Sequence, residues 1–147
     1  MWREKEITRE FQKGEIIIKE GDLGREMFII KSGSVKVMKK DDDGKITDLA
    51  TLERGDFFGE MAILENAPRT AMVIAREATS LLVLNVGSFL IKIRKDPSFA
   101  FTMMQKMSNR IRILNERLLK KDEGNRVGSS EMNLAITQSE YLHDRNL

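Results

Sequence analysis

Short β-rich runs separated by glycine-containing turns fill the chain up to about Asn85, and this pattern constrains the fold most. The runs Ile16–Ile18, Met27–Ile30 and Val35–Met38 are rich in branched and aromatic side chains. Three aspartates and a glycine follow the third run at positions 41–44, a typical hairpin signal. Turns at this spacing predict an antiparallel sandwich or barrel and not alternating β-α-β units.

Further strands are expected over residues 46–52, 71–75 and 81–84, and then the period of the sequence changes. A short helix is predicted over about 86–94, and a long one from Pro97 to about Lys120, with Gly124 beyond its end. Apolar residues in the long helix recur alternately four and three positions apart, at Ala100, Met104, Met107, Ile111, Leu114 and Leu118. This spacing is the a/d seam of a heptad pattern. It predicts a homodimer through this helix, and the alternative is packing against the chain's own β-rich part.

The composition is typical of a folded, soluble protein with 41% apolar and 33% charged residues. The formal net charge is only +2, which favours neither nucleic acid nor an anionic membrane as the main partner. The charged N-terminus lacks the apolar stretch of a signal peptide, and the apolar runs are too short to span a bilayer. The absence of cysteine excludes disulfides and suits a reducing compartment, so a cytoplasmic location is expected.

No cluster of residues in the sequence is suited to catalysis or to metal binding. His143 is the only histidine, and neither a Walker-type loop nor a plausible Ser/His/Asp set occurs. We therefore expect no enzymatic activity, no metal and no cofactor. Residues 122–147 have a linker-like start and no convincing period, which predicts a flexible tail without a domain of its own.

The most informative segment runs from Gly55 to Ala71. Gly59 permits an unusual backbone conformation just before a helix-compatible run at 61–64, and the start of a helix favours an anion. Arg69 follows a proline and leads into a β-rich run, and its planar guanidinium matches phosphate oxygens. Glu60 is suited to accept hydrogen bonds from a hydroxyl group. An anion site beside a hydroxyl site describes a phosphorylated sugar.

The order Phe-Gly-Glu, apolar positions, a spacer, Pro-Arg, a small residue and Ala resembles the phosphate-binding cassette of the cyclic nucleotide-binding domain family. The glycine-punctuated segments 13–15, 20–22 and 27–33 are also similar to that family, and the likeness covers about 11–119. The resemblance implies a mainly β fold with flanking helices. Its centre is an eight-stranded antiparallel β-roll, a double-stranded β-helix, followed by a long C-terminal helix. One domain over 1–121 is expected, with the roll at about 11–85 and the helices at about 86–121.

The resemblance also implies a role for each matching residue. Glu60 should bond the ribose 2′-hydroxyl and Arg69 an exocyclic phosphate oxygen. Thr70 should reach the phosphate or a purine edge. Backbone N–H groups near Gly59, Met61 and Ala62 should complete the phosphate site. Contacts to the base are expected from the long helix, with the candidates Asn115, Leu114, Ile111 and Arg110.

The functional hypothesis is a stand-alone regulatory module that binds cyclic AMP, or else cyclic GMP. It would signal through its C-terminal helices to a downstream protein partner. One alternative is the ligand-binding part of a transcription regulator without its DNA-binding domain. Direct DNA binding is not expected, since the roughly 25 residues after the helix are too few for a helix-turn-helix domain. Another alternative is a dimerisation scaffold that binds no ligand.

Overall fold

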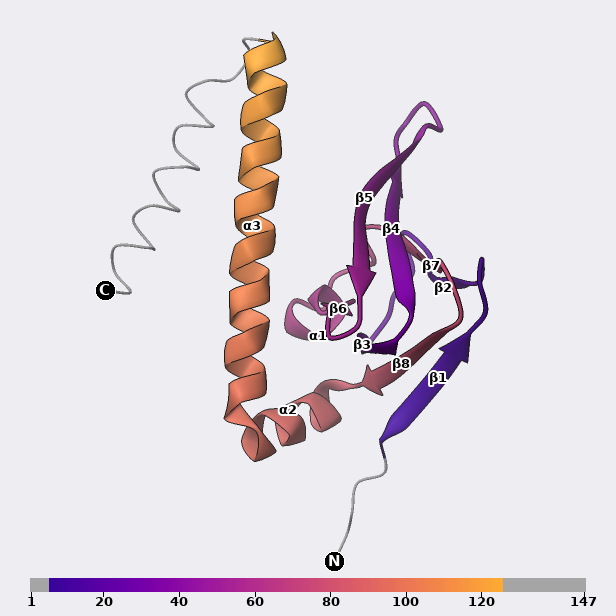
Figure 1. Ribbon diagram of the computed structural model, residues 1–147, viewed down its shortest axis with the longest axis vertical. Coiled ribbons are helices and arrows are strands. Elements are labelled where there is room, and N and C mark those ends of the chain that lie inside the picture. Colours follow the sequence, from indigo (N-terminus) through magenta and orange to yellow (C-terminus); the bar gives the residue numbers. More distant parts are fainter. Residues whose placement is uncertain (1–5, 126–147) are drawn as a thin grey trace, which may run out of the picture. The chain divides into compact units, whose positions relative to one another are not determined.

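The structure is a computed structural model that describes residues 6–125, in which the chain forms eight strands and three helices (Figure 1). Their bounds are β1 (Ile7–Phe11), β2 (Ile16–Ile18), β3 (Met27–Ser32), β4 (Ser34–Lys40), β5 (Ile46–Glu53), β6 (Phe57–Phe58), α1 (Met61–Leu64), β7 (Met72–Ala75), β8 (Thr79–Leu84), α2 (Val86–Lys95) and α3 (Pro97–Asn125).

The strands form two antiparallel sheets of four strands each. One sheet has the order β1-β8-β3-β6 and the other the order β2-β7-β4-β5. Neighbouring strands are therefore mostly distant in sequence, as the winding of a roll requires. The predicted fold class, an antiparallel β-roll followed by a long helix, is confirmed.

The hydrophobic core lies between the two sheets. Phe28 on β3 and Phe58 on β6 stack with ring centroids 5.1 Å apart, an arrangement that contributes about 0.5–1.5 kcal/mol beyond burial. The cluster around this pair draws buried side chains from both sheets: Ile18, Phe28, Ile30, Val35, Phe58, Val73, Leu81 and Val83. Branched and aromatic runs in the sequence thus supply the inner faces of the roll.

A tight turn joins β3 to β4 and requires glycine. Gly33 has a φ of +87°, and a Cβ there would lie only 2.5 Å from the Ala78 carbonyl oxygen and the Thr79 hydroxyl. The buried Thr79 hydroxyl accepts a hydrogen bond from the Ser34 N–H at 3.2 Å and lies 3.0 Å from the Ser34 carbonyl oxygen. The start of β8 is thereby fixed against the start of β4.

Two strands were not predicted from the sequence. The roll begins at Ile7 with β1, before the expected start near Phe11, and β1 pairs with β8 at the edge of its sheet. Four of its five residues are exposed. A strand without a buried face does not alternate between apolar and polar residues, so its sequence does not mark it as a strand. The strand β6 has only two residues, which are too few to show a period.

The helices α1 and α2 lie where the sequence predicts them. Asn85 begins α2 with a capping box: its side chain accepts from the Ser88 N–H, and the Ser88 hydroxyl accepts from the Asn85 N–H, each at 2.9 Å. The prediction that the long helix ends near Lys120 is wrong, since α3 continues to Asn125 and includes Gly124. A single glycine in a last turn costs only about 1 kcal/mol relative to alanine, so it does not stop the helix. The rest of the expected tail, 126–147, lies outside the described residues.

The chain divides into two compact units between Phe99 and Ala100. The first contains the roll with α1 and α2, and the second contains nearly all of α3. Among the helices that the structure describes, none combines the length and the apolar character needed to cross a membrane.

Candidate functional site

The segment between β6 and β7 makes a sharp turn, a short helix and a second turn. Gly59 follows β6 with a φ of +81°, which a residue with a side chain rarely adopts. Glu60 then leads into the four residues of α1. Asn66 has a φ of 51°, a left-handed conformation that asparagine tolerates, and it turns the chain back toward the roll. These turns bring Arg69 near to Gly59.

The backbone of Arg69 is tied to the loop that follows β2. The Arg69 N–H donates to the Asp22 carbonyl oxygen at 2.9 Å, and the Gly21 N–H donates to the Arg69 carbonyl oxygen at 2.8 Å. These two hydrogen bonds fix the base of the arginine side chain against residues 21–22. The position of the guanidinium therefore depends on this loop as well as on the cassette.

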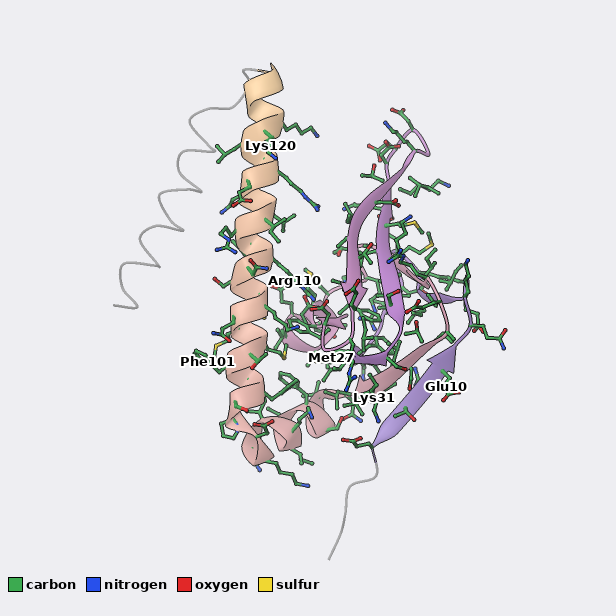
Figure 2. The ribbon with its side chains drawn as sticks, in the orientation of Figure 1. Glu10, Met27, Lys31, Phe101, Arg110 and Lys120 are labelled. Atoms are coloured by element: carbon green, nitrogen blue, oxygen red, sulfur yellow. The ribbon has the colours of Figure 1, made fainter. Side chains whose placement is uncertain are left out.

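The Arg69 guanidinium bridges two backbone carbonyl groups. Its Nη1 donates to the Gly59 carbonyl oxygen at 3.0 Å, and its Nη2 donates to the Glu26 carbonyl oxygen at 2.7 Å. Its Cζ lies 6.0 Å from the centre of the Phe28 ring, which belongs to the core. The arginine thus links the cassette, the loop before β3 and the core. Figure 2 shows Met27, the fully buried residue after Glu26, inside the roll.

Burial lowers the pKa of the Arg69 guanidinium from its ordinary value, while the negative charges of Glu26, Glu60 and Asp22 oppose that shift. The group stays charged at any physiological pH, because arginine titrates far above neutrality. A half-buried cation that has lost part of its hydration gains more from an anionic ligand than an exposed cation does. Two of its five N–H groups bond the carbonyls, which orients the guanidinium as a donor for an anion.

The other predicted cassette residues lie in the same neighbourhood. Glu60 is half-buried, and its charge is close enough to raise the pKa of Arg69. Met61 is 40% exposed, whereas Ala62 is buried and its N–H donates weakly to the Gly59 carbonyl oxygen at 3.3 Å. Thr70 is exposed beside Arg69. The structure therefore brings together the arginine and the carboxylate that the sequence singled out.

The predicted base contacts all lie on the second unit, in α3, and stay predictions. Figure 2 shows Phe101, Arg110 and Lys120 spaced along this helix. Four of the six seam residues are more than half exposed: Met104 (60%), Ile111 (55%), Leu114 (54%) and Leu118 (51%). Ala100 and Met107, also in the seam, are partly buried, as is the base candidate Asn115.

The Glu26 carbonyl and Gly24 are two neighbours of the Arg69 guanidinium that the sequence did not predict. The Glu26 carbonyl is a backbone group, which every residue type offers, so no pattern marks it. Gly24 lies directly beside the guanidinium, with space for no side chain. In the sequence, Gly24 looks like any other glycine in a turn, so nothing singles it out. Among residues 6–125, no group of His, Cys, Asp or Glu side chains is suited to hold a metal ion.

Comparisons with known proteins agree with this geometry. The family model described as "Cyclic nucleotide-binding domain" matches residues 8–96, more than half of the chain. The cAMP-dependent protein kinase regulatory subunit of Mycosarcoma maydis is 46% identical over 71 residues, which are 48% of this chain and 13% of the relative. The cGMP-dependent protein kinase of Plasmodium berghei is 39% identical over 74 residues, which are 50% of this chain and 8% of that protein.

The crystal structure of Thermus thermophilus catabolite activator protein is similar in fold, with a TM-score of 0.69 and 32% sequence identity. The match covers 77% of this chain and 53% of that one. This chain thus spans a small part of the two kinase-related proteins and about half of the catabolite activator protein. From the β-roll, the cassette and the family match over residues 8–96, the chain belongs to the cyclic nucleotide-binding domain family.

Proposed function

We propose that this domain binds a cyclic nucleotide, with the Arg69 guanidinium on an exocyclic phosphate oxygen and the Glu60 carboxylate on the ribose 2′-hydroxyl. The observation that supports this most is the bridge from Arg69 to the carbonyl oxygens of Gly59 and Glu26. It holds a partly desolvated cation in place, close enough to the half-buried Glu60 carboxylate to feel its charge. Preorganisation of this kind lowers the entropic cost of binding.

A cyclic phosphate diester matches the two charges of the site. It carries one negative charge, which the arginine neutralises, and its ribose offers a hydroxyl donor to the carboxylate. The carboxylate would repel a second negative charge, so 5′-AMP, whose phosphate is close to dianionic at neutral pH, should bind less well. We propose a binding and regulatory role without catalysis.

Cyclic AMP is the preferred ligand in this proposal, and cyclic GMP is the second candidate. The relatives are named for both nucleotides, a cAMP-dependent kinase subunit and a cGMP-dependent kinase. The Thr70 hydroxyl is exposed beside Arg69 and would tolerate a guanine edge. The preference for cyclic AMP rests on the likeness to the cyclic AMP receptor protein of Thermus thermophilus, which is 34% identical over 71% of this chain.

Thermal unfolding of the full chain with added nucleotide tests the proposal. A ligand at 100 times its dissociation constant adds about 2.7 kcal/mol to the free energy of unfolding. Cyclic AMP should raise the melting temperature by several degrees, cyclic GMP by less, and 5′-AMP hardly at all. A melting temperature that no cyclic nucleotide changes, even at millimolar concentration, would leave the scaffold hypothesis as the better one.

We further propose that ligand capture is transmitted through the C-terminal helices to a protein partner, and that α3 pairs two copies of the chain. The exposed apolar stripe of Met104, Ile111, Leu114 and Leu118 supports the pairing, because such stripes on a helix usually mark an interface.

Nitroxide labels at Lys45 in the β4–β5 hairpin and at Lys120 test the transmission. If the distance between the labels is the same with and without cyclic AMP, the domain binds the nucleotide without transmitting a conformational change.

A further inference from the structure

The side of the Arg69 guanidinium that faces the loop before β3 lies against Gly24. A Cβ atom on Gly24 would lie 2.5 Å from Arg69 Cζ and 2.5 Å from Nε, and closer still to Nη2. Real Cβ atoms do not approach other atoms within 3.0 Å, so one of the two groups would have to move. The space for the arginine in its present position exists only because residue 24 has no side chain.

The backbone of Gly24 does not itself require glycine. Six other glycines of the described chain have a φ between +81° and +89°, which explains their residue type, and Gly24 is not among them. An alanine would fit the backbone at this position without strain. The reason for a glycine here is therefore the neighbouring guanidinium and not the turn.

The loop that carries Gly24 cannot easily withdraw from Arg69. Hydrogen bonds of 2.8 and 2.9 Å join residues 21 and 22 to the arginine backbone, and the Glu26 carbonyl, two residues after Gly24, accepts from Nη2. The flexible end of the arginine side chain would move instead. Gly24 and Arg69 both line a cavity of about 180 Å³, into which a displaced guanidinium has room to turn.

We infer that Gly24 is a positioning residue for ligand binding: it sets where the Arg69 guanidinium stands between the carbonyls of Gly59 and Glu26. This inference rests on the proposed function for its effect on affinity, but the placement of the arginine is testable without a ligand. Substitution of Gly24 by alanine should leave the fold intact, since only the end of one side chain must move. It should break the carbonyl bridge and weaken ligand binding.

The first experiment compares cyclic AMP binding by calorimetry for the wild-type chain, Gly24→Ala and Gly87→Ala. Gly87 in α2 also lacks a positive φ, and a Cβ there would lie 3.4 Å from its nearest neighbour, the Asn85 Oδ1, so it provides the matched control. Gly24→Ala should weaken binding roughly 10- to 100-fold, the equivalent of one hydrogen bond to a charged group, and Gly87→Ala should bind as the wild type does. An affinity of Gly24→Ala equal to that of the wild type would overturn the inference.

The second experiment uses the ligand-free protein, so it separates this inference from the proposed function. The Nε–Hε signal of Arg69 in a ¹⁵N NMR spectrum is identified by its loss in Arg69→Ala. It should shift in Gly24→Ala and stay in place in Gly87→Ala. An unshifted signal would contradict the positioning role, whether or not cyclic AMP binds.

A double substitution keeps the test decisive if Gly24→Ala alone fails to fold. In the Arg69→Ala background the conflict with the guanidinium is gone, so Gly24→Ala should then lower the melting temperature far less than it does in the wild-type background. If the double variant is as destabilised as Gly24→Ala alone, residue 24 requires glycine for another reason and the inference is wrong.

Discussion

At the scale of single residues, the site depends on the planar geometry of Arg69 as much as on its charge. A lysine at this position keeps the charge but has a single nitrogen. That nitrogen cannot reproduce the planar guanidinium, which donates to the Gly59 and Glu26 carbonyls and still has N–H groups left for an anion. Arg69→Lys should weaken cyclic AMP binding about 10- to 100-fold, measured by calorimetry. Arg76→Lys, at an exposed arginine, is the matched control and should bind normally.

Glu60 is expected to act on one atom of the ligand, the ribose 2′-hydroxyl. Glu60→Ala should weaken binding of cyclic AMP by about 1.5–3 kcal/mol, the contribution of a hydrogen bond to a charged group. It should weaken binding of 2′-deoxy cyclic AMP far less, because that ligand lacks the hydroxyl. Equal losses for the two ligands would show that Glu60 acts elsewhere, for example by holding Arg69 in place.

The sequence points to the charged residues of the proposed site, whereas it gives no sign of the groups that support Arg69. Arg69 and Glu60 stand at a recognisable spacing, and the structure brings them into one neighbourhood. The carbonyls that hold Arg69 are backbone atoms, which leave no trace in the residue pattern. Gly24 looks like one turn glycine among many, and only the distance from its Cβ position to the guanidinium distinguishes it.

At the scale of elements, the end of the roll passes into α2 through a capping box that is testable separately from the ligand. Asn85 accepts from the Ser88 N–H at 2.9 Å, and an alanine would leave the first turn of α2 without this acceptor. Asn85→Ala should lower the free energy of unfolding by about 0.5–2 kcal/mol in urea denaturation. Asn85→Asp keeps the acceptor and should unfold close to the wild-type midpoint. If both variants unfold alike, the cap contributes nothing.

Helices and strands with a run of β-branched and aromatic residues or a clear hydrophobic period could be predicted from the sequence. Strands that form only because a neighbouring strand pairs with them could not. The runs that became β3 and β4 supply buried side chains to the core, so their composition marks them. The edge strand β1 is largely exposed, and it is a strand because β8 offers hydrogen-bonding groups along its edge. The two residues of β6 are fixed by pairing with β3 and by the stacking of Phe58 on Phe28.

At the scale of the whole molecule, the exposed stripe on α3 predicts self-association. Leu118→Glu would place a charge in a seam of which four of the six members are more than half exposed in the single chain. Sedimentation equilibrium should show a dimer for the wild type and a monomer for this variant. Lys120→Glu, away from the seam in the heptad pattern, should leave the dimer unchanged. A monomeric wild type at high micromolar concentration would contradict the pairing proposal.

The most direct test of the account is a calorimetric titration of the full chain with cyclic AMP, for the wild type and for Arg69→Ala. The wild type should bind one nucleotide per chain with saturation. Arg69→Ala should show no measurable binding while it keeps the melting temperature of a folded domain, because removal of one member of a desolvated charge pair costs about 2–5 kcal/mol. Binding by Arg69→Ala with wild-type affinity would contradict the account.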